Sequence, residues 1–293
     1  MKKNVFKGCA TALITPFRNG KIDYASLGNI INSQVAAGVD ALVIGGTTAE
    51  AATLSPYERE KLYRFAGEAI CGRTKLIFGV GTNDTADVVR RVRLADKIGC
   101  DGLLIVTPYY NRGTEGGVVS HYLRIASMTD TPIILYNVPS RTGVNLSIGQ
   151  LEVLAGCSGI VGIKEATDSL ARFTEIAKFG DELTLYAGND NSTYTALSLG
   201  GGGVISVLSN LMPRSVVGLC RAYADGNEAL ALREQLRLLP IMNAMFRDTN
   251  PVPVKYAMSL LGLCLEDVRL PLSELSEATR ESIRNTLKEF QDN

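Results

Sequence analysis

The sequence has almost no histidine, since His121 is the single one among 293 residues, and it contains no tryptophan. A zinc site built from histidines, or a Ser-His-Asp triad, therefore has almost no material to use. His121 itself lies in a helix-like pattern of polar and apolar residues, and we interpret it as a surface or packing residue. Any chemistry must come from lysine, tyrosine, threonine or carboxylate side chains.

The sequence also lacks a CxxC pair, a basic run and any apolar run near the roughly 18 residues of a membrane helix. Its formal net charge is zero, with acids and bases interleaved. We therefore expect a soluble, cytoplasmic protein that binds neither nucleic acid nor a membrane. Scattered cysteines in a chain of this size indicate reduced core residues rather than a disulfide framework. They are Cys9, Cys71, Cys100, Cys157, Cys220 and Cys264.

What the sequence does have is a regular alternation of short apolar runs and amphipathic stretches, up to about residue 225. Eight runs rich in Ile, Val and Leu, spaced to leave room for one helix between neighbours, predict an α/β protein folded as a (β/α)8 TIM barrel. A doubly wound open sheet is the main rival, but the GxGxxG turn typical of it is missing. The runs are Ala10–Ile14, Ala41–Ile44, Leu76–Phe78, Leu103–Val106, Ile133–Tyr136, Ile160–Ile163, Leu183–Tyr186 and Val204–Val207.

The intervening helices have start and stop signals. Ser55 to Glu58 predicts an N-cap with a capping box, Asp23 and Asp84 precede similar segments, and Gly38, Gly99 and Gly180 lie where helices should end. After the eighth run the strand signal stops, and the chain from 227 to 293 is helix-like throughout. We expect a catalytic barrel over residues 1–226 and, over residues 227–293, a C-terminal helical extension of two or three helices packed on it, with a break at 248–253.

Polar residues follow several of the predicted strands, and active sites of such barrels lie at the carboxyl ends of the strands. Lys164 is the most unusual, because a lysine at the end of a buried strand has an energetic cost unless it is paired or neutral. Burial lowers a lysine pKa and frees the amine to attack carbonyls. The alternatives are an ion pair with Glu165 or a side chain turned toward solvent, and spacing alone does not choose among them.

Other residues at the same rim fit this chemistry but are individually ambiguous. Tyr136 ends the neighbouring strand and could transfer protons, or simply cap the barrel mouth. Thr47 and Thr48 follow two glycines in a turn that could hold a carboxylate. Arg141 could bind a carboxylate through its planar fork, although a surface arginine is the commoner case.

Taken together, the motifs at these positions resemble those of a known family. Gly-Gly-Thr-Thr-Ala-Glu (45–50), Thr-Pro-Tyr-Tyr-Asn (107–111), Tyr-Asn-Val-Pro-Ser-Arg-Thr-Gly (136–143) and Gly-Ile-Lys-Glu-Ala (162–166) are similar to those of the 4-hydroxy-tetrahydrodipicolinate synthases, which belong to the pyruvate-dependent class I aldolases. The resemblance extends through nearly the whole chain and includes Asn-Pro-Val-Pro-Val-Lys (250–255).

The resemblance implies a reaction and an assignment of roles. Pyruvate would form a Schiff base on Lys164 without any cofactor, and its enamine would attack the aldehyde of L-aspartate 4-semialdehyde. A keto-sugar-acid aldolase of the same superfamily is the alternative, and a non-catalytic keto-acid-binding barrel is a third. The implied proton relay is Tyr136, Thr48 and Tyr110; the implied substrate contacts are Thr47, Thr48, Arg141, Gly188 and the backbone near Ile205.

The resemblance also bears on assembly and control. Relatives are commonly homotetramers in which the tyrosine matching Tyr110 reaches into a partner's site, and some are inhibited by lysine at a site between subunits. Arg59 would repel the ammonium group of lysine, which predicts weak or absent inhibition. Ala49 stands where the family usually has glycine. The implied regulatory positions are Ala51, Arg59, Asn83, Asp87 and Tyr109, with Pro56 nearby.

Overall fold

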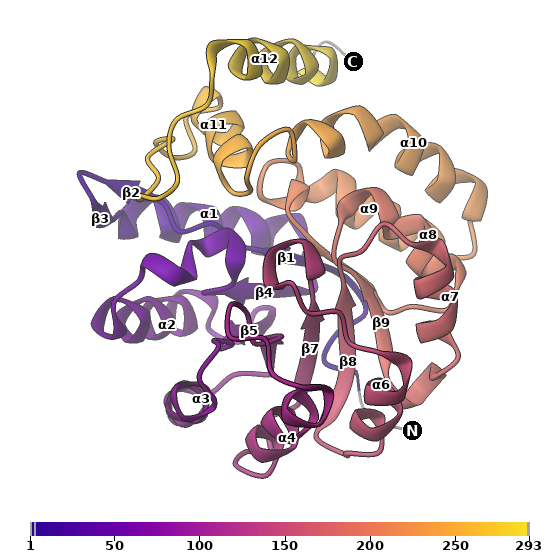
Figure 1. Cartoon of the computed structure of the whole chain (residues 1–293). Helices are drawn as coiled ribbons and strands as arrows, with labels where there is room; N and C mark the ends of the chain where they lie inside the picture. The colour runs from indigo at the N-terminus through magenta and orange to yellow at the C-terminus, as the bar shows by residue number, and fades with distance from the viewer. Residues whose placement is uncertain (1, 3, 292–293) are drawn as a thin grey trace.

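The computed structural model describes residue 2 and residues 4–291, with Gln291 described in its backbone alone. Eight parallel strands form a closed barrel in the order β1-β10-β9-β8-β7-β6-β5-β4 (Figure 1). The predicted (β/α)8 barrel is confirmed, and each of the eight apolar runs overlaps a barrel strand. The strands are β1 (Gly8–Ala12), β4 (Ala41–Ile44), β5 (Lys75–Gly79), β6 (Gly102–Val106), β7 (Ile133–Asn137), β8 (Ile160–Glu165), β9 (Thr184–Ala187) and β10 (Gly203–Ser206).

Helices surround the strands as an outer layer (Figure 1). The capping box at Ser55 and the side-chain caps at Asp23 and Asp84 are confirmed. Gly38 and Gly99 end helices as predicted, whereas the helix before Gly180 already ends at Ala177. The barrel helices are α1 (Tyr24–Ala37), α2 (Pro56–Ile70), α3 (Thr85–Ile98), α4 (Glu115–Ala126), α5 (Pro139–Thr142), α6 (Ile148–Ala155), α7 (Leu170–Ala177), α8 (Thr193–Ser198) and α9 (Pro213–Ala224).

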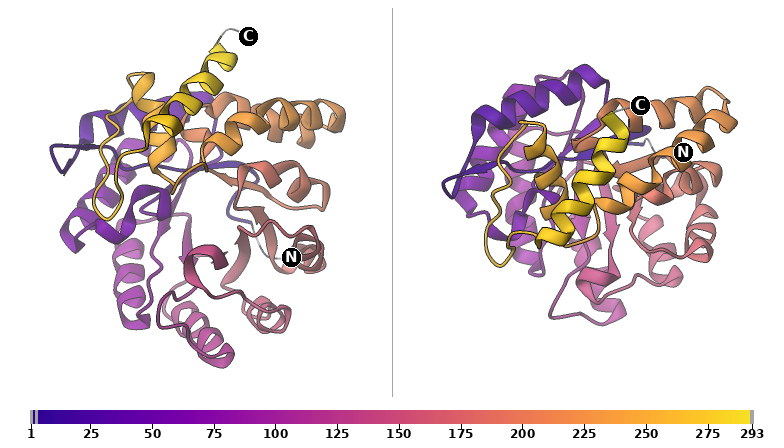
Figure 2. Two further views of the ribbon diagram at one scale, coloured as in Figure 1. Left: turned by 45° about the horizontal axis from the view of Figure 1, so that its top comes forward. Right: turned by 90° about the horizontal axis from the view of Figure 1, so that it is seen from above.

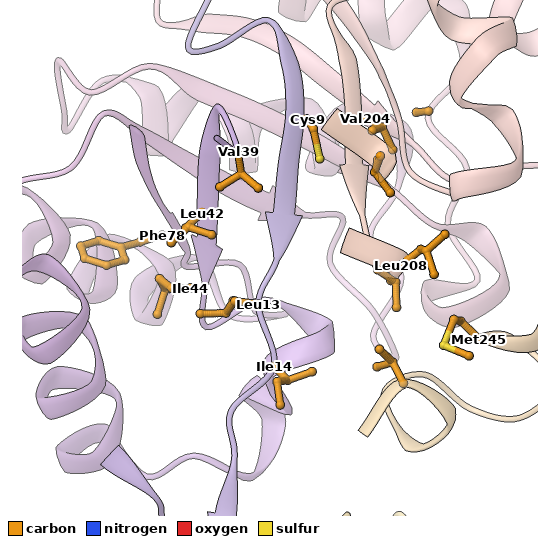
Figure 3. Close-up of a cluster of buried hydrophobic side chains, with 14 of the residues drawn as sticks. Cys9, Leu13, Ile14, Val39, Leu42, Ile44, Phe78, Val204, Leu208 and Met245 are labelled. Atoms are coloured by element: carbon orange, nitrogen blue, oxygen red, sulfur yellow. The ribbon is translucent and has the colours of Figure 1, made fainter. Parts of the chain in front are cut away.

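The apolar residues form two clusters because side chains alternate between the two faces of each strand. On β4, Ala41 and Val43 belong to the cluster that fills the barrel, and Leu42 and Ile44 belong to the cluster between strands and helices. Figure 3 shows part of the outer cluster, where Leu42, Ile44 and Phe78 lie together beside the strands. This double burial explains why the strands read as continuous apolar runs.

The cysteines are free, but the prediction that they are core residues is only partly right. Cys9, Cys220 and Cys264 are buried. Cys71, in contrast, is exposed, because it follows the last turn of α2 in a left-handed conformation that points away from the core. Cys100 and Cys157 are partly exposed.

The described residues after α9 form three helices, α10 (Glu228–Ala244), α11 (Val252–Leu260) and α12 (Glu277–Gln291). Figure 2 shows them on one side of the barrel, with α12 in yellow outermost. The predicted break at 248–253 is confirmed at its core, but the expectation of helix throughout is wrong for residues 261–276, where no helix forms and Pro271 interrupts the chain. Among the described residues, no helix is both long enough and apolar enough to cross a membrane.

A small hairpin, β2 (Phe17–Arg18) and β3 (Lys21–Ile22), was not predicted. Its strands are two residues long, too short to produce an apolar run. The signal that marks it is the Asn19-Gly20 turn, in which both residues have positive φ, the conformation that two-residue hairpin loops require.

The tail is joined to the barrel by a buried ion pair. Lys255, on α11, is fully buried and places its Nζ 2.7 Å from Glu50 Oε1, just after the threonine turn. The other Glu50 oxygen accepts from the backbone N–H of Arg269, and the Arg269 guanidinium binds Glu58. The Lys255 ammonium also lies 4.4 Å from the ring centre of Phe17. Barrel and tail therefore share charged groups that neither could bury alone.

Candidate active site

The carboxyl ends of the strands enclose a cavity of about 580 Å³. It is lined by Lys164 on β8, Tyr136 on β7, Thr48 after β4, Arg141 on α5 and Gly188 after β9. Parallel strands carry all these residues to one rim, which is where active sites of this fold lie. Five residues proposed from the sequence are thus assembled around one space.

Lys164 points into the barrel mouth, with only 4% of its surface exposed. Its Nζ lies 4.4 Å from the ring centre of Tyr136, its neighbour in the register of β7 and β8. The next residue, Glu165, faces the helix layer instead, where it binds Asn137 and Arg172. Neither of the two other possibilities for Lys164 is found. Its side chain does not point to solvent, and it forms no ion pair with Glu165.

The surroundings of Lys164 make its amine reactive. Burial lowers the Lys164 pKa from 10.5 to about 8, the nearby Asp190 opposes the change, and the charge of Arg141 adds to it. Asp190 is itself buried and held by the hydroxyl of Ser206 and the backbone N–H groups of Val207 and Leu208. A lower pKa leaves more of the lysine as free amine near neutral pH.

We expect the rate of pyruvate capture by Lys164 to rise with pH up to about 8 and to level off above it. The reason is that only the unprotonated amine attacks a carbonyl. At pH 7 a pKa of about 8 gives about 300 times more free amine than a pKa of 10.5. The measurement is the initial rate of borohydride-trapped adduct against pH. In an Asp190→Asn variant the midpoint should move to lower pH, and a midpoint near 10.5 in the unmodified enzyme would contradict the assignment.

The threonine turn contacts the site differently from the implied relay. The Tyr136 pKa is raised by burial, and the charge of Arg141 and a hydrogen bond with Thr47 oppose that rise. Thr48 Oγ1 instead accepts a hydrogen bond of 2.9 Å from Asn250 Nδ2. Within one chain, therefore, Thr47 is the threonine next to the phenol, while Thr48 faces Asn250.

Asn250, in the tail, is a site residue to which sequence reasoning gave no role. Its side chain donates to Thr48, and its backbone carbonyl accepts a hydrogen bond of 3.0 Å from Arg141 Nη2. Its own Oδ1 is buried without a hydrogen-bond partner among the described residues. Asn250 thus aligns the threonine turn with the arginine and leaves one acceptor facing the site region. The motif over residues 250–255 was the sequence feature that could have pointed to this role of Asn250.

Gly188 is required by close approach of the backbone. A Cβ at this position would lie 2.7 Å from the carbonyl oxygen of Glu165 and from the Cβ of Ala166. Its own N–H donates to that carbonyl at 2.7 Å. Gly188 therefore lets the end of β9 pack against the end of β8 and keeps the residue after Lys164 in place.

Three of the implied residues, Thr47, Ile205 and Tyr110, do not line this cavity. Ile205 is fully buried inside the barrel, and Val207, two residues later, lines the cavity instead. Tyr110 has 91% of its surface exposed and a φ of +68° in the loop after β6. A relay through Tyr110 is not formed within one chain, and its action in a partner subunit stays a prediction.

A second cavity, of about 380 Å³, adjoins the first and shares Tyr136, Arg141 and Asn250 with it. Of the positions implied for regulation, Ala51, Arg59 and Tyr109 line it. Asp87 pairs with Arg91, which also lines it, and the backbone carbonyl of Asn83 accepts from Asn111. Lysine sensitivity is not decided by this arrangement and stays a prediction.

His121 is a packing residue, in agreement with the interpretation from sequence. It is buried on α4, and its Nδ1 lies 2.9 Å from the hydroxyl of Thr85 on α3. Burial lowers the His121 pKa to about 4, so the ring is neutral near pH 7. In the part of the chain that the structure describes, no cluster of three or more His, Cys, Asp or Glu residues could hold a metal ion.

Comparison with known proteins agrees with this geometry. Residues 5–290 match the model of the dihydrodipicolinate synthetase family. The chain belongs to this family. A relative from Geobacter sulfurreducens, named 4-hydroxy-tetrahydrodipicolinate synthase, is 43% identical over 98% of this chain and 99% of its own. The crystal structure of dihydrodipicolinate synthase from Aquifex aeolicus superposes with a TM-score of 0.95 at 41% identity, covering 98% of both chains.

A structure of the dihydrodipicolinate synthase from Acinetobacter baumannii, described as chloride inhibited and complexed with pyruvate, superposes with a TM-score of 0.94 at 35% identity. It covers 97% of this chain and 98% of that one. Family membership confirms the resemblance drawn from the motifs and excludes the non-catalytic barrel as the best account of the chain.

Ala49 departs from the family pattern at a position where its extra methyl group is tolerated. Ala49 is buried in the short turn after the two threonines, and its carbonyl accepts a hydrogen bond of 2.9 Å from Thr15. The positive φ in this turn falls on Glu50, not on Ala49. The methyl group of Ala49 therefore causes no backbone strain.

Proposed function

We propose that this enzyme catalyses the 4-hydroxy-tetrahydrodipicolinate synthase reaction, the condensation of pyruvate with L-aspartate 4-semialdehyde, with Lys164 as the Schiff-base residue. The observation that carries the assignment of roles is the buried amine of Lys164 against the Tyr136 ring, in a cavity that also contains Arg141. The activity is that of a lyase in the diaminopimelate and lysine biosynthesis pathway.

In the first step the Lys164 amine attacks the keto carbon of pyruvate and forms a carbinolamine. Loss of water gives an iminium, and loss of a methyl proton gives the enamine. These steps need a group that gives and accepts protons near the nitrogen, and the phenol of Tyr136, whose ring centre lies 4.4 Å from Lys164 Nζ, is suited to this. Its partner in this role is Thr47, whose hydrogen bond opposes the effect of burial on the phenol. The lysine supplies the electron sink, so no cofactor is needed.

In the second step the enamine carbon attacks the semialdehyde, and the amino group of the product then displaces Lys164 by ring closure. The semialdehyde carries a carboxylate where a sugar carries hydroxyl groups. Arg141 is the cation at the cavity wall that is suited to that carboxylate, and Asn250 holds it from the tail. This charge favours the semialdehyde over the sugar-acid alternative.

We expect an Arg141→Ala variant to lose about 10- to 100-fold in kcat/KM for the semialdehyde, because one charged contact is worth roughly 1.5–3 kcal/mol. It should still form the pyruvate adduct. Adduct formation is best compared above pH 8, since removing the Arg141 charge should raise the Lys164 pKa. The kcat/KM of an Arg141→Lys variant, which keeps the positive charge but not the planar guanidinium, should lie between those of the unmodified enzyme and of Arg141→Ala. Equal loss of adduct and turnover would show that Arg141 serves the lysine rather than the semialdehyde.

The test of the proposed function as a whole is direct. The protein is incubated with pyruvate, reduced with borohydride and digested, and the adduct is located by peptide mass. Turnover of the semialdehyde is then compared with that of sugar aldehydes. An adduct at Lys164 with preference for the semialdehyde is the expected result. An adduct with preference for a sugar aldehyde would favour the alternative aldolase, and no adduct would exclude both.

Three further properties are proposed with the function. Tyr110 lies on an exposed loop, which fits a role across a subunit interface. The assembly that we expect is a homotetramer. The balanced charge and the absence of a membrane-spanning helix in the described chain fit a cytoplasmic enzyme. Arg59 in the implied regulatory cavity fits weak or absent inhibition by lysine.

A further inference from the structure

A network of buried polar side chains lies behind the active-site rim, on the outer side of β7 and β8. Glu165 is fully buried at the end of β8, and Asn137 is fully buried at the end of β7. The side-chain nitrogen of Asn137 donates to the two carboxylate oxygens of Glu165, at 3.0 and 2.9 Å. Arg172, on α7, donates from Nε to the same carboxylate at 3.4 Å. None of these three described residues lines the cavity around Lys164.

The network lies one residue beyond the two groups that the reaction uses. In the register of β7 and β8, Tyr136 pairs with Lys164, and Asn137 pairs with Glu165. Because side chains alternate between the two faces of a strand, the first pair points into the barrel and the second into the helix layer. The side-chain hydrogen bonds therefore join the two strands at their last paired position, directly after the reacting pair.

The same side chains hold the segment that leads away from Arg141. Asn137 Oδ1 accepts a hydrogen bond of 3.1 Å from the backbone N–H of Leu146. The Arg172 guanidinium donates to the backbone carbonyl of Leu146. The chain that leaves α5, the helix of Arg141, is thus tied both to the end of β7 and to α7.

Stability alone is a poor reason for a buried ion pair at this position. The attraction between two buried charges only partly offsets the cost of removing them from water, so apolar residues of similar size often stabilise a fold as well. A satisfied polar network provides rigidity and direction instead. Glu165 Oε1 also accepts a hydrogen bond of 3.1 Å from the backbone N–H of Thr167, which lines the cavity just after Lys164. Burial raises the Tyr136 pKa, and the negative charge of Glu165 adds to that rise, which keeps the phenol protonated.

We propose that Glu165 is a positioning residue of the reaction, whose carboxylate holds the ends of β7 and β8 so that the Lys164 amine stays against the Tyr136 ring. It acts through Asn137 and Arg172 and does not touch the substrate. The inference rests on the proposed function, since Lys164 and Tyr136 must be the reacting pair. It predicts a selective loss, in which pyruvate still binds but reacts slowly. The threonine turn after β4, where we expect the pyruvate carboxylate, is not reached by the hydrogen bonds of the network within the described chain.

The experiment measures the rate of the borohydride-trapped pyruvate adduct on the full-length enzyme over a range of pyruvate concentrations. In Glu165→Gln, which keeps the size of the side chain, we expect the rate at saturating pyruvate to fall by about 10- to 100-fold, because a misplacement of reacting atoms by about 1 Å can cost about 100-fold. The pyruvate concentration at half-saturation should change by less than about threefold.

Tyr122→Phe is the matched control for loss of a buried hydrogen bond. It removes the bond of 3.2 Å from the Tyr122 hydroxyl to the backbone carbonyl of Ile105, in the helix layer behind β6. This residue lies outside the active-site cavity, so the rate at saturating pyruvate should change by less than about twofold.

Exchanging the two partners gives a readout that a purely structural role would not produce. Asn137→Asp alone places two carboxylates against each other and should be slower than Glu165→Gln. The double variant Asn137→Asp/Glu165→Gln restores one carboxylate and one amide, with their strands exchanged. It should form the adduct faster than either single variant, whereas independent structural damage would make it slower than both.

Three outcomes would overturn the inference: an unchanged rate at saturating pyruvate in Glu165→Gln, an equal loss in Tyr122→Phe, or a double variant slower than both single variants. If Glu165→Gln does not fold, Glu165→Gln with Arg172→Met removes both charges and must show the same loss of rate. If the unmodified enzyme forms no adduct at Lys164, the proposed function fails and this inference fails with it. A normal adduct rate in Glu165→Gln refutes the inference alone.

Discussion

A Lys164→Ala variant is expected to lose essentially all turnover and to give no pyruvate adduct after borohydride reduction. The covalent route exists only through this amine, so no neighbouring group can replace it at comparable rate. The loss should appear in kcat, with the barrel still folded, because removal of a buried amine that has no ion-pair partner among the described residues costs little stability. Peptide mass after reduction and a coupled assay of semialdehyde consumption are the two measurements.

Lys255 provides the matched comparison within the same chain. It is the more deeply buried of the two lysines, at 0% exposure against 4%, and its amine is held by Glu50. If burial alone made a lysine reactive, Lys255 should also trap pyruvate. We expect all of the adduct on Lys164 and none on Lys255. A substantial adduct elsewhere in the unmodified enzyme, or residual turnover in Lys164→Ala, would require a different nucleophile.

The largest expected effect on stability comes from the same ion pair. Lys255→Met should lower the free energy of unfolding by about 3–5 kcal/mol, because it leaves the Glu50 carboxylate buried without its counter-charge. Thermal and urea unfolding at a fixed chain concentration measure the change. Turnover should fall as well, since Glu50 ends the turn that carries Thr47 and Thr48.

Two controls separate this effect from a general loss of charge. Lys75→Met removes a lysine from a pair with Asp101 that is largely exposed, and should cost at most about 1 kcal/mol. Combining Glu50→Gln with Lys255→Met removes both charges and should recover part of the loss. If Lys75→Met and Lys255→Met were equally destabilising, the buried pair would not be the link that we describe.

The strands and the rim could be predicted because they depend on local patterns. A strand buried on both faces produces a continuous apolar run, and the residue at its end is brought to the rim by topology alone. Lys164, Tyr136 and Arg141 were found in this way. The helix-like interpretation of residues 261–276 failed because amphipathic spacing does not reveal a chain held by tertiary contacts such as those of Arg269.

What the sequence concealed were pairings between distant residues. Asn250 meets Thr48 across 202 positions, and Lys255 meets Glu50 across 205. Neither pair leaves a local pattern, because a hydrogen bond in the fold has no period along the chain. Both tail residues belong to the motif Asn-Pro-Val-Pro-Val-Lys (250–255), whose two polar ends are the two contacts. The motif was visible, but its partners were not.

The contact between Asn250 and Thr48 has a consequence for how the enzyme folds during its synthesis. Domains fold largely from the N-terminus as they are synthesised, and the eight strands end at Ser206, well before the tail is made. A nascent chain can therefore close its barrel while Thr48 and Arg141 still lack the residue that aligns them. The barrel would then form first, and the enzyme would become competent only once the segment around Asn250 has docked.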